Sequence, residues 1–146
     1  MALMFERFGD PATAWVVGSA PSGWQMSETV RFSSPQDDSV MTLERTVTND
    51  AIDSLFFAQT QLGFIEGMNP DWRMFAGLTT VHVGGAEADG YVGAFRATDP
   101  YVHVVVKLWA SFGQVKLVGS VFTSEQAWRE SGQEMVSAFR GLVVLR

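Results

Sequence analysis

The segment YVHVVVKLWASF, residues 101–112, decides the fold, because its side chains alternate with a period of two residues. One side of this predicted strand is apolar and carries Val102, Val104, Val106, Leu108 and Ala110. The other side carries Tyr101, His103, Val105, Lys107 and Trp109. We expect the first side to face the core, whereas the second mixes aromatic, aliphatic and polar groups.

Two-residue alternation extends outward from this segment in both directions. Residues 24–32 and 39–48 alternate on either side of the turn cluster 33–38, which predicts a β-hairpin. After Pro70 the alternating stretches are 72–83, 89–97, 101–112 and 114–122, separated by turn signals at Gly84-Gly85, Asp99-Pro100 and Gly113. Short turns between consecutive strands indicate an antiparallel meander.

Two segments have a helical pattern instead. Residues 51–67 follow the potential N-caps Asn49 and Asp50, contain no proline and end at Gly67. A second helix is predicted from the capping-box pair Thr123 and Gln126. Its apolar face consists of Trp128, Gly132, Met135, Phe139 and Leu142. We therefore predict one α+β domain over residues 1–146 with about six antiparallel strands and two helices, in the order ββ-α-ββββ-α. Residues 1–20 form an N-terminal extension that could add an edge strand.

Composition excludes several classes of function. Ten Lys and Arg residues against sixteen Asp and Glu give a net charge of −6, and the scattered basic residues argue against nucleic acid as a partner. The chain contains no cysteine and two histidines, so we predict no metal site and no cofactor. The first ten residues include Glu6, Arg7 and Asp10 and lack the apolar run of a signal peptide or membrane span. The expected location is cytoplasmic.

No catalytic motif stands out. The chain has no Gly-x-Ser-x-Gly elbow, and the glycine-rich residues 84–90 lead into a predicted strand, which favours a hairpin loop over a phosphate loop. We therefore expect the protein not to be an enzyme. The enzymatic alternative is a small hydrolase or isomerase that uses His103 with a loop carboxylate.

The order of landmarks suggests a family. Pro21-Ser22-Gly23-Trp24 is followed by a strand ending at Phe32 and Pro35, a long helix, antiparallel strands and a terminal helix that includes Trp128. This order resembles the PsbP/DcrB-like superfamily, nearest to the effector-associated (Eag-type) chaperones of bacterial type VI secretion. The resemblance implies a sandwich on an antiparallel sheet and a dimer that shelters transmembrane helices of a secreted effector. Mog-type or photosystem-type roles in the same superfamily remain open.

The mixed side of the 101–112 strand is the predicted partner-binding surface, because apolar area supplies affinity and polar groups fix register. The residues that we assign to it are Gln25, Ser27, His103, Val105 and Trp109. Its neighbours on the next strand are either Lys116, Val118, Ser120 and Phe122 or the complementary set. The alternative is that the protein's own helix covers this side.

The function expected from these residues is a chaperone or adaptor that binds an apolar or transmembrane-like segment of another protein. A structural subunit of a secretion or phage-like assembly is a further alternative. The 51–67 helix is apolar on more than one stripe, which predicts a homodimer that covers the excess.

Overall fold

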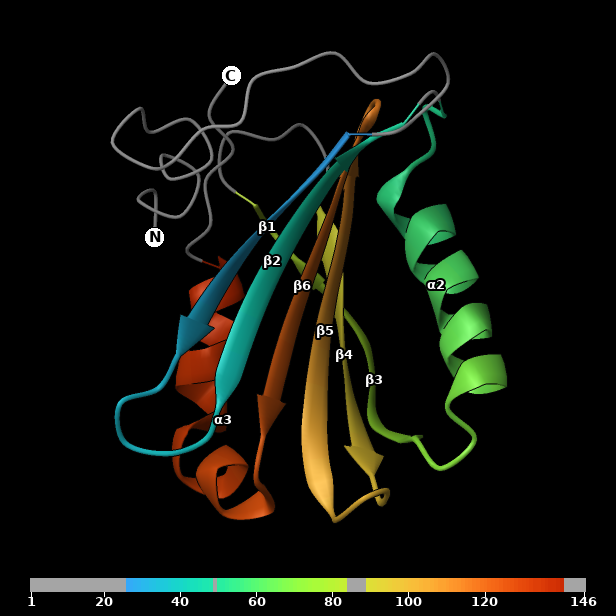
Figure 1. The fold of residues 1–146 in the computed structure, drawn as a ribbon. Helices are drawn as coiled ribbons and strands as arrows, with labels where there is room; N and C mark the ends of the chain where they lie inside the picture. Colours follow the sequence, from blue (N-terminus) through green and yellow to red (C-terminus); the bar gives the residue numbers. More distant parts are fainter. Residues whose placement is uncertain (1–25, 49, 84–88, 141–146) are drawn as a thin grey trace.

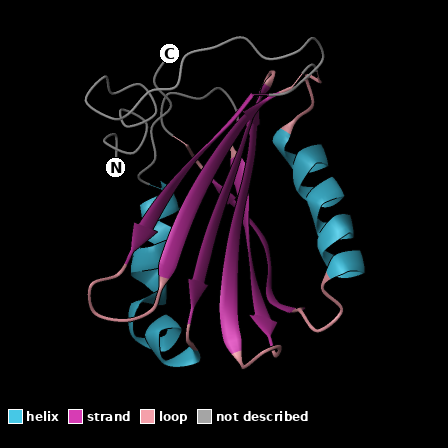
Figure 2. Ribbon diagram, viewed as in Figure 1, coloured by secondary structure: helices cyan, strands magenta, loops and turns pink. Residues whose placement is uncertain are grey.

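A computed structural model of the chain describes residues 26–48, 50–83 and 89–140. These residues form one six-stranded antiparallel sheet with two helices, as Figures 1 and 2 show. The elements are β1 (Met26–Ser33), β2 (Val40–Val47), α2 (Ser54–Met68), β3 (Arg73–Val81), β4 (Gly90–Ala97), β5 (His103–Phe112), β6 (Val115–Thr123) and α3 (Glu125–Arg140). The predicted α+β class and element order are confirmed.

The strands are arranged in the order β1-β2-β6-β5-β4-β3. β6 therefore joins the β1–β2 hairpin to the rest of the sheet, and β1 and β3 are its two edges among the described strands. β5 lies inside the sheet, where its run of β-branched Val104, Val105 and Val106 is fully buried. Burial on both sides follows because α2 and α3 pack on opposite faces of β5.

The face toward α3 holds the larger core. Val104, Val106, Leu108 and Ala110 of β5 belong to it, as their alternation predicts. Phe139 of α3 is fully buried there, and a Cβ on Gly119 would approach its ring to 2.6 Å. The absence of a side chain at position 119 thus lets the helix pack closely on β6.

The face toward α2 holds a smaller core. Val105 and Trp109 of β5 and Phe95 of β4 are buried there against Phe57 and Ala58 of α2. The Phe95 and Trp109 rings meet edge to face, with centroids 6.4 Å apart. The two sides of β5 that the alternation distinguishes therefore face two separate hydrophobic cores.

Both ends of α2 differ from the sequence prediction. Asp53 caps the helix by accepting a 2.7 Å hydrogen bond from the Phe56 N–H, and the predicted Asp50 does not have that role, whereas Asn49 lies outside the described residues. The reason is tertiary, because the Ser54 hydroxyl accepts the Ser111 N–H at 2.9 Å and fixes the first turn against β5. At the other end the helix continues through Gly67 to Met68, and Asn69 is its C-cap.

The start of α3 also differs from the prediction. The Ser124 hydroxyl, and not that of Thr123, accepts the hydrogen bond from the Ala127 N–H at 3.0 Å. The Thr123 hydroxyl lies 2.7 Å from that of Ser39 and is hydrogen-bonded to it. The predicted positions of residues 1–20, the Gly84-Gly85 turn and Leu142 lie outside the described residues. Neither helix of the described part is long and apolar enough to cross a membrane.

Gly119→Ala should lower the free energy of unfolding by about 1–3 kcal/mol, because the added methyl group overlaps the Phe139 ring. Phe139→Ala, which leaves a cavity, should cost about 3–5 kcal/mol. Gly63→Ala is the matched control, since nothing lies within 4 Å of its added Cβ on α2, and it should be neutral or stabilising. Urea denaturation followed by circular dichroism measures all three, and equal effects at 119 and 63 would contradict this packing.

Candidate binding surface

One half of the face toward α2 has no described helix over it. α2 packs on β5 and β4, whereas β6, β2 and β1 continue beyond it, as Figure 1 shows. Strand pairing determines which side chains point to this side. They are Ser27, Thr29, Arg31 and Ser33 on β1, Val40, Thr42, Glu44 and Thr46 on β2, and Lys116, Val118, Ser120 and Phe122 on β6. We call these twelve positions the open half-face.

The open half-face is apolar at the end nearest the β1–β2 turn, where Phe122 and Val40 lie, whereas the rest of it carries Val118, short hydroxyl groups and the charged Arg31 and Glu44. Phe122 is 37% exposed although it lies on an inner strand, and it pairs with Val40 across β6 and β2. Val118 is half-buried against the core under α2. Most of the other positions are Ser or Thr. Apolar area among short hydroxyl groups suits an apolar ligand whose polar groups must still be satisfied.

Lys107 lies at the border between the covered and the open part. It points to the side of α2, opposite Ser120 in the register of β5 and β6. Its Nζ donates a 2.7 Å hydrogen bond to the Ser120 hydroxyl. Burial lowers the pKa of Lys107, and the charge of Glu44 opposes that shift. The partly desolvated ammonium group of Lys107 thus lies at this border, and it has two hydrogens besides the one that it donates to Ser120.

Lys116, by contrast, has a structural role. Its Nζ donates to the carbonyl oxygens of Asp50 at 2.6 Å and of Gly113 at 2.7 Å. These bonds join the segment before α2 to the β5–β6 turn. Burial also lowers the pKa of Lys116, with the charge of Asp50 acting in the opposite direction.

The residues that we assigned to a partner site share one side of the sheet but differ in accessibility. Ser27 is exposed on β1, where its hydroxyl accepts a 3.4 Å hydrogen bond from that of Thr46. His103 is half-buried at the start of β5. Val105 and Trp109 are fully buried beneath α2, so neither lines an open surface. At these two positions the alternative interpretation, coverage by the protein's own helix, is correct. Gln25 lies outside the described residues.

Sequence reasoning missed the combination of Phe122, Val118 and Val40. The pattern of residues 114–122 places Phe122 and Val118 on one side, but two registers against β5 were open. The pairs Trp109 with Val118 and Val105 with Phe122 resolve this choice. The alternation of residues 114–122 therefore predicts that Phe122 and Val118 share one side of the strand, but it does not predict that Phe122 is exposed.

The two histidines occupy different settings. His82 Nδ1 lies 3.1 Å from Asp89 Oδ1, and both side chains are well exposed beside the β3–β4 connection. His103 Nδ1 lies 2.7 Å from the carbonyl oxygen of Tyr101. Among the described residues, no three His, Asp or Glu side chains are grouped as a metal site requires. Asp71 accepts the N–H groups of Thr98 and Asp99 at 3.0 Å each, which holds the β4–β5 turn and lowers the pKa of Asp71.

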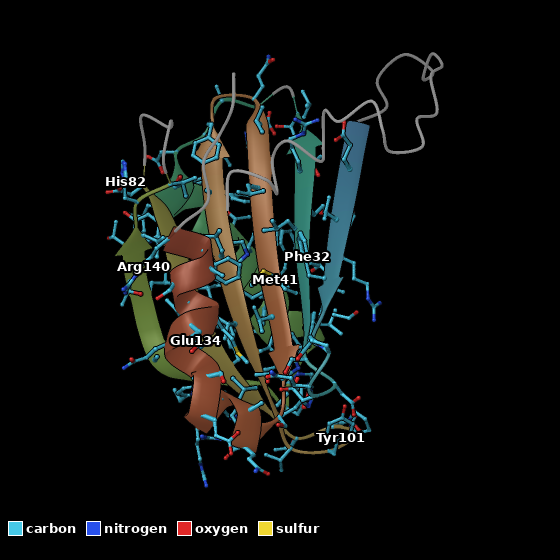
Figure 3. The ribbon with its side chains drawn as sticks, turned by 90° about the vertical axis from the view of Figure 1, so that its left-hand side faces the viewer. Phe32, Met41, His82, Tyr101, Glu134 and Arg140 are labelled. Carbon is cyan, nitrogen blue, oxygen red and sulfur yellow. The ribbon has the colours of Figure 1, made fainter. Side chains whose placement is uncertain are left out.

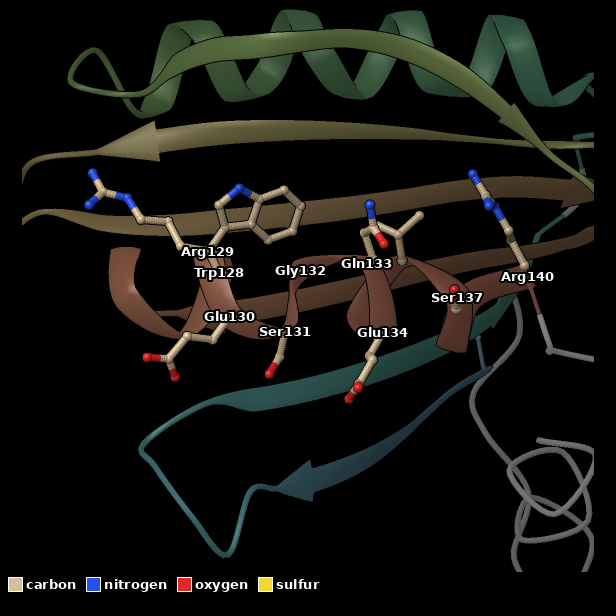
Figure 4. A pocket seen from close by; sticks show the side chains of 10 residues that line it. Trp128, Arg129, Glu130, Ser131, Gly132, Gln133, Glu134, Ser137 and Arg140 are labelled. Carbon is tan, nitrogen blue, oxygen red and sulfur yellow. The ribbon is translucent and has the colours of Figure 1, made fainter.

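A hollow of about 940 Å³ lies along α3, and Figure 4 shows the side chains that line it. All of the described residues around it belong to this one helix, from Trp128 to Arg140. The Trp128 ring lies over Gly132, since a Cβ there would be 2.8 Å from the indole. No residue of a second described element lines it, although the Phe75 ring of β3 contacts Trp128 at its edge, so the hollow forms no convergent site. No histidine lines it.

Comparisons with known proteins support the fold. No protein-family model matches the chain, and no curated protein matches it. Among solved structures, it is similar to PA94 of Pseudomonas aeruginosa, a protein of unknown function, with a TM-score of 0.69 and 13% identity over 87% of this chain and 90% of that one. CalU16 of Micromonospora echinospora is 16% identical over 80% of this chain and 81% of its own, but its TM-score of 0.31 carries no argument.

Lys107→Met should raise the free energy of unfolding at neutral pH, because the native state holds Lys107 with a lowered pKa. Between that lowered pKa and the ordinary value of 10.5, the unfolded chain binds more protons than the native state, so stability rises with pH. The Lys107→Met variant should lack this increase in the free energy of unfolding with pH. Lys116→Met is the control and should cost about 1–3 kcal/mol, since it leaves two carbonyl groups without their donor. Denaturation from pH 7 to 11 tests both, and a destabilised Lys107→Met at pH 7 would contradict the argument.

Proposed function

We propose that this protein is a chaperone or adaptor that binds an apolar, helix-forming segment of another protein on the open half-face. The observation that carries the proposal is the position of Phe122. It is a large apolar side chain on an inner strand, and it stays partly exposed beside the part of the same sheet face that α2 covers over β5 and β4. Val40 lies beside it on β2, and Val118 lies further along the same side of β6, beyond Ser120.

The dimensions favour a single helix as the bound segment. Three strands spaced about 4.8 Å apart present a strip roughly 14 Å wide. An α-helix with its side chains is about 10–12 Å across. One helix therefore fits over β6, β2 and β1 beside α2, and would complete this layer of the sandwich.

Polar groups on the open half-face would set the position of the bound segment. Thr42 is half-buried on β2, opposite the buried Ser120, and its hydroxyl can donate to or accept from backbone groups of the partner. Lys107 can donate to carbonyl oxygens that are left without partners at the C-terminal end of a helix. Such groups give a register to an apolar contact that otherwise has little directional preference.

The resemblance to effector-associated chaperones suggests a transmembrane-like helix of a secreted effector as the partner, met in the cytoplasm before export. Catalysis by His103 has less support. Its Nδ1 is hydrogen-bonded to the Tyr101 carbonyl group, and the ring does not line the hollow along α3. Binding is therefore the function that the arrangement of these residues favours.

Phe122→Asp should leave the fold intact and weaken binding of an apolar helical peptide at least about 100-fold. The carboxylate is solvated in the free protein and loses this hydration against the apolar helix in the complex. The probe is a fluorescent 20-residue Leu/Ala peptide with a neutral polyether tag, followed by anisotropy. Phe75→Asp is the matched control, because Phe75 is 39% exposed but lies on β3 and contacts Trp128 on the side of α3.

A further variant distinguishes an exposed binding residue from a residue of the core. Val105→Asp should prevent folding, because it places a charge in the core under α2. Circular dichroism of each free variant reports the fold. Full peptide affinity in a folded Phe122→Asp variant would refute binding at the open half-face.

We also propose that the protein forms a homodimer through α2. Leu55, Phe56, Phe64 and Met68 are exposed on this helix, and Met68 is 77% exposed. Pairing two copies about a two-fold axis covers such a surface on both at once.

Replacing Phe64 and Met68 together with Lys should convert the dimer to a monomer without unfolding it, since both side chains are exposed. Light scattering over a 100-fold concentration range measures the mass. The control for added charge is a variant in which Gln59 and Thr60, which are also exposed on α2, are both replaced with Lys. A monomeric wild-type protein at every concentration would contradict the dimer.

A further inference from the structure

A groove lies between α3 and the β1–β2 hairpin, on the opposite side of the sheet from the open half-face. Its volume is about 360 Å³, within the range of binding pockets. The apolar residues that line it from the side of α3 are Phe32, Met41, Val121, Met135 and Ala138, and Val40 also borders it although the strand register directs its side chain to the other side. Figure 3 shows Phe32 and Met41 on the hairpin beside Glu134 on α3. Four elements meet here, in contrast to the hollow along α3.

The rim of this hairpin groove is acidic. Asp37 in the hairpin turn and Glu134 on α3 both line it. None of the ion pairs among the described residues includes either carboxylate. The remaining rim positions include the hydroxyl side chains of Ser39 and Ser131, which carry no charge. The groove thus joins an apolar floor to two carboxylates without a cation.

The turn that holds Asp37 is fixed by hydrogen bonds. Asp37 Oδ1 accepts the Ser39 N–H at 2.7 Å, and the Ser39 hydroxyl is bonded to that of Thr123 at the end of β6. The bonds from Ser39 lower the pKa of Asp37, so its carboxylate is ionised at neutral pH. The acidic rim is therefore in place before any ligand arrives.

We infer that the hairpin groove binds a short segment of a protein partner in which an apolar side chain lies next to Lys or Arg. The apolar side chain fills the floor beside Met41 and Met135, and the basic group lies between Asp37 and Glu134. The net charge of −6 favours the approach of such a basic segment. This site is independent of the open half-face, because the two lie on opposite sides of the sheet.

The size of the groove limits the segment. The lining residues of α3 extend from Ser131 to Ala138, which corresponds to about 10 Å along the helix. An extended chain advances about 3.3 Å per residue, so roughly three residues fit. The smallest complete ligand is thus a basic residue with an apolar residue beside it.

Methionine methyl groups provide a direct test in the full chain. Met41 and Met135 line the groove, whereas Met68 and Met74 lie on α2 and β3 and serve as internal controls. The protein is labelled with ¹³C-methyl methionine and titrated with a blocked pentapeptide that has Arg between two Leu residues. We expect saturable shifts of the Met41 and Met135 signals. Asp37→Asn with Glu134→Gln should weaken binding about tenfold, because both charges are lost. Asn at position 37 can still accept the Ser39 N–H, so the turn is kept.

Three further arms determine whether the proposal holds. The same peptide with Glu in place of Arg, or with Ser in place of both Leu residues, should not bind. Phe122→Asp should leave the titration unchanged, so failure of the open half-face and failure of this groove are distinguishable. Shifts at Met68 or Met74 alone, equal binding of the Glu peptide, or undiminished binding to the double variant would each overturn the proposal. Arginine amide alone should also not reproduce the shifts of the Met41 and Met135 signals. Equal shifts would overturn the proposal, because they would show that the groove binds small cations and not a peptide segment.

Discussion

The width of the sheet relative to one helix is the constraint on which the rest of the structure depends. Six strands about 4.8 Å apart span about 24 Å between the two edges, whereas an α-helix with its side chains covers about 10–12 Å. One helix on each side, α2 over β5 and β4 and α3 over β5 and β6, therefore leaves part of both faces without a described helix. The open half-face and the hairpin groove are two such parts, and both lie toward β1 and β2.

The side chains beside the open half-face and the hairpin groove are consistent with a sheet that its own helices cover only in part. Under α2, Val105 and Trp109 are fully buried, and Lys107 lies between them on the same side of β5, paired with Ser120 of β6. A domain built for stability alone would place an apolar residue at position 107, because a desolvated ammonium group is costly. Across the sheet from β5 to β6, the part covered by α2 ends at this polar pair. On the other side, Phe32 and Met41 are half-buried beside α3, and the carboxylates of Asp37 and Glu134 stand at their rim.

Local sequence signals predicted the elements better than their ends. The segment 51–67 is helical as expected, yet its N-cap is Asp53, because the Ser54 hydroxyl is bonded to the backbone of β5. Ser124 caps α3 while the Thr123 hydroxyl is bonded to Ser39 in the hairpin turn. In both cases several residues could serve as the cap, and a contact with a distant strand selects one of them.

The sequence by itself determined the element order and the sides of β5, because side-chain direction in a strand alternates strictly with position. It placed Ser27, His103, Val105 and Trp109 on one side of the sheet, and the four share it. Only the tertiary structure decided that α2 covers Val105 and Trp109 and leaves Phe122 partly exposed. The period of a strand carries no information about which of its residues a helix will cover. That depends on strand order, register and the position of α2, which arise from contacts between residues far apart in the chain.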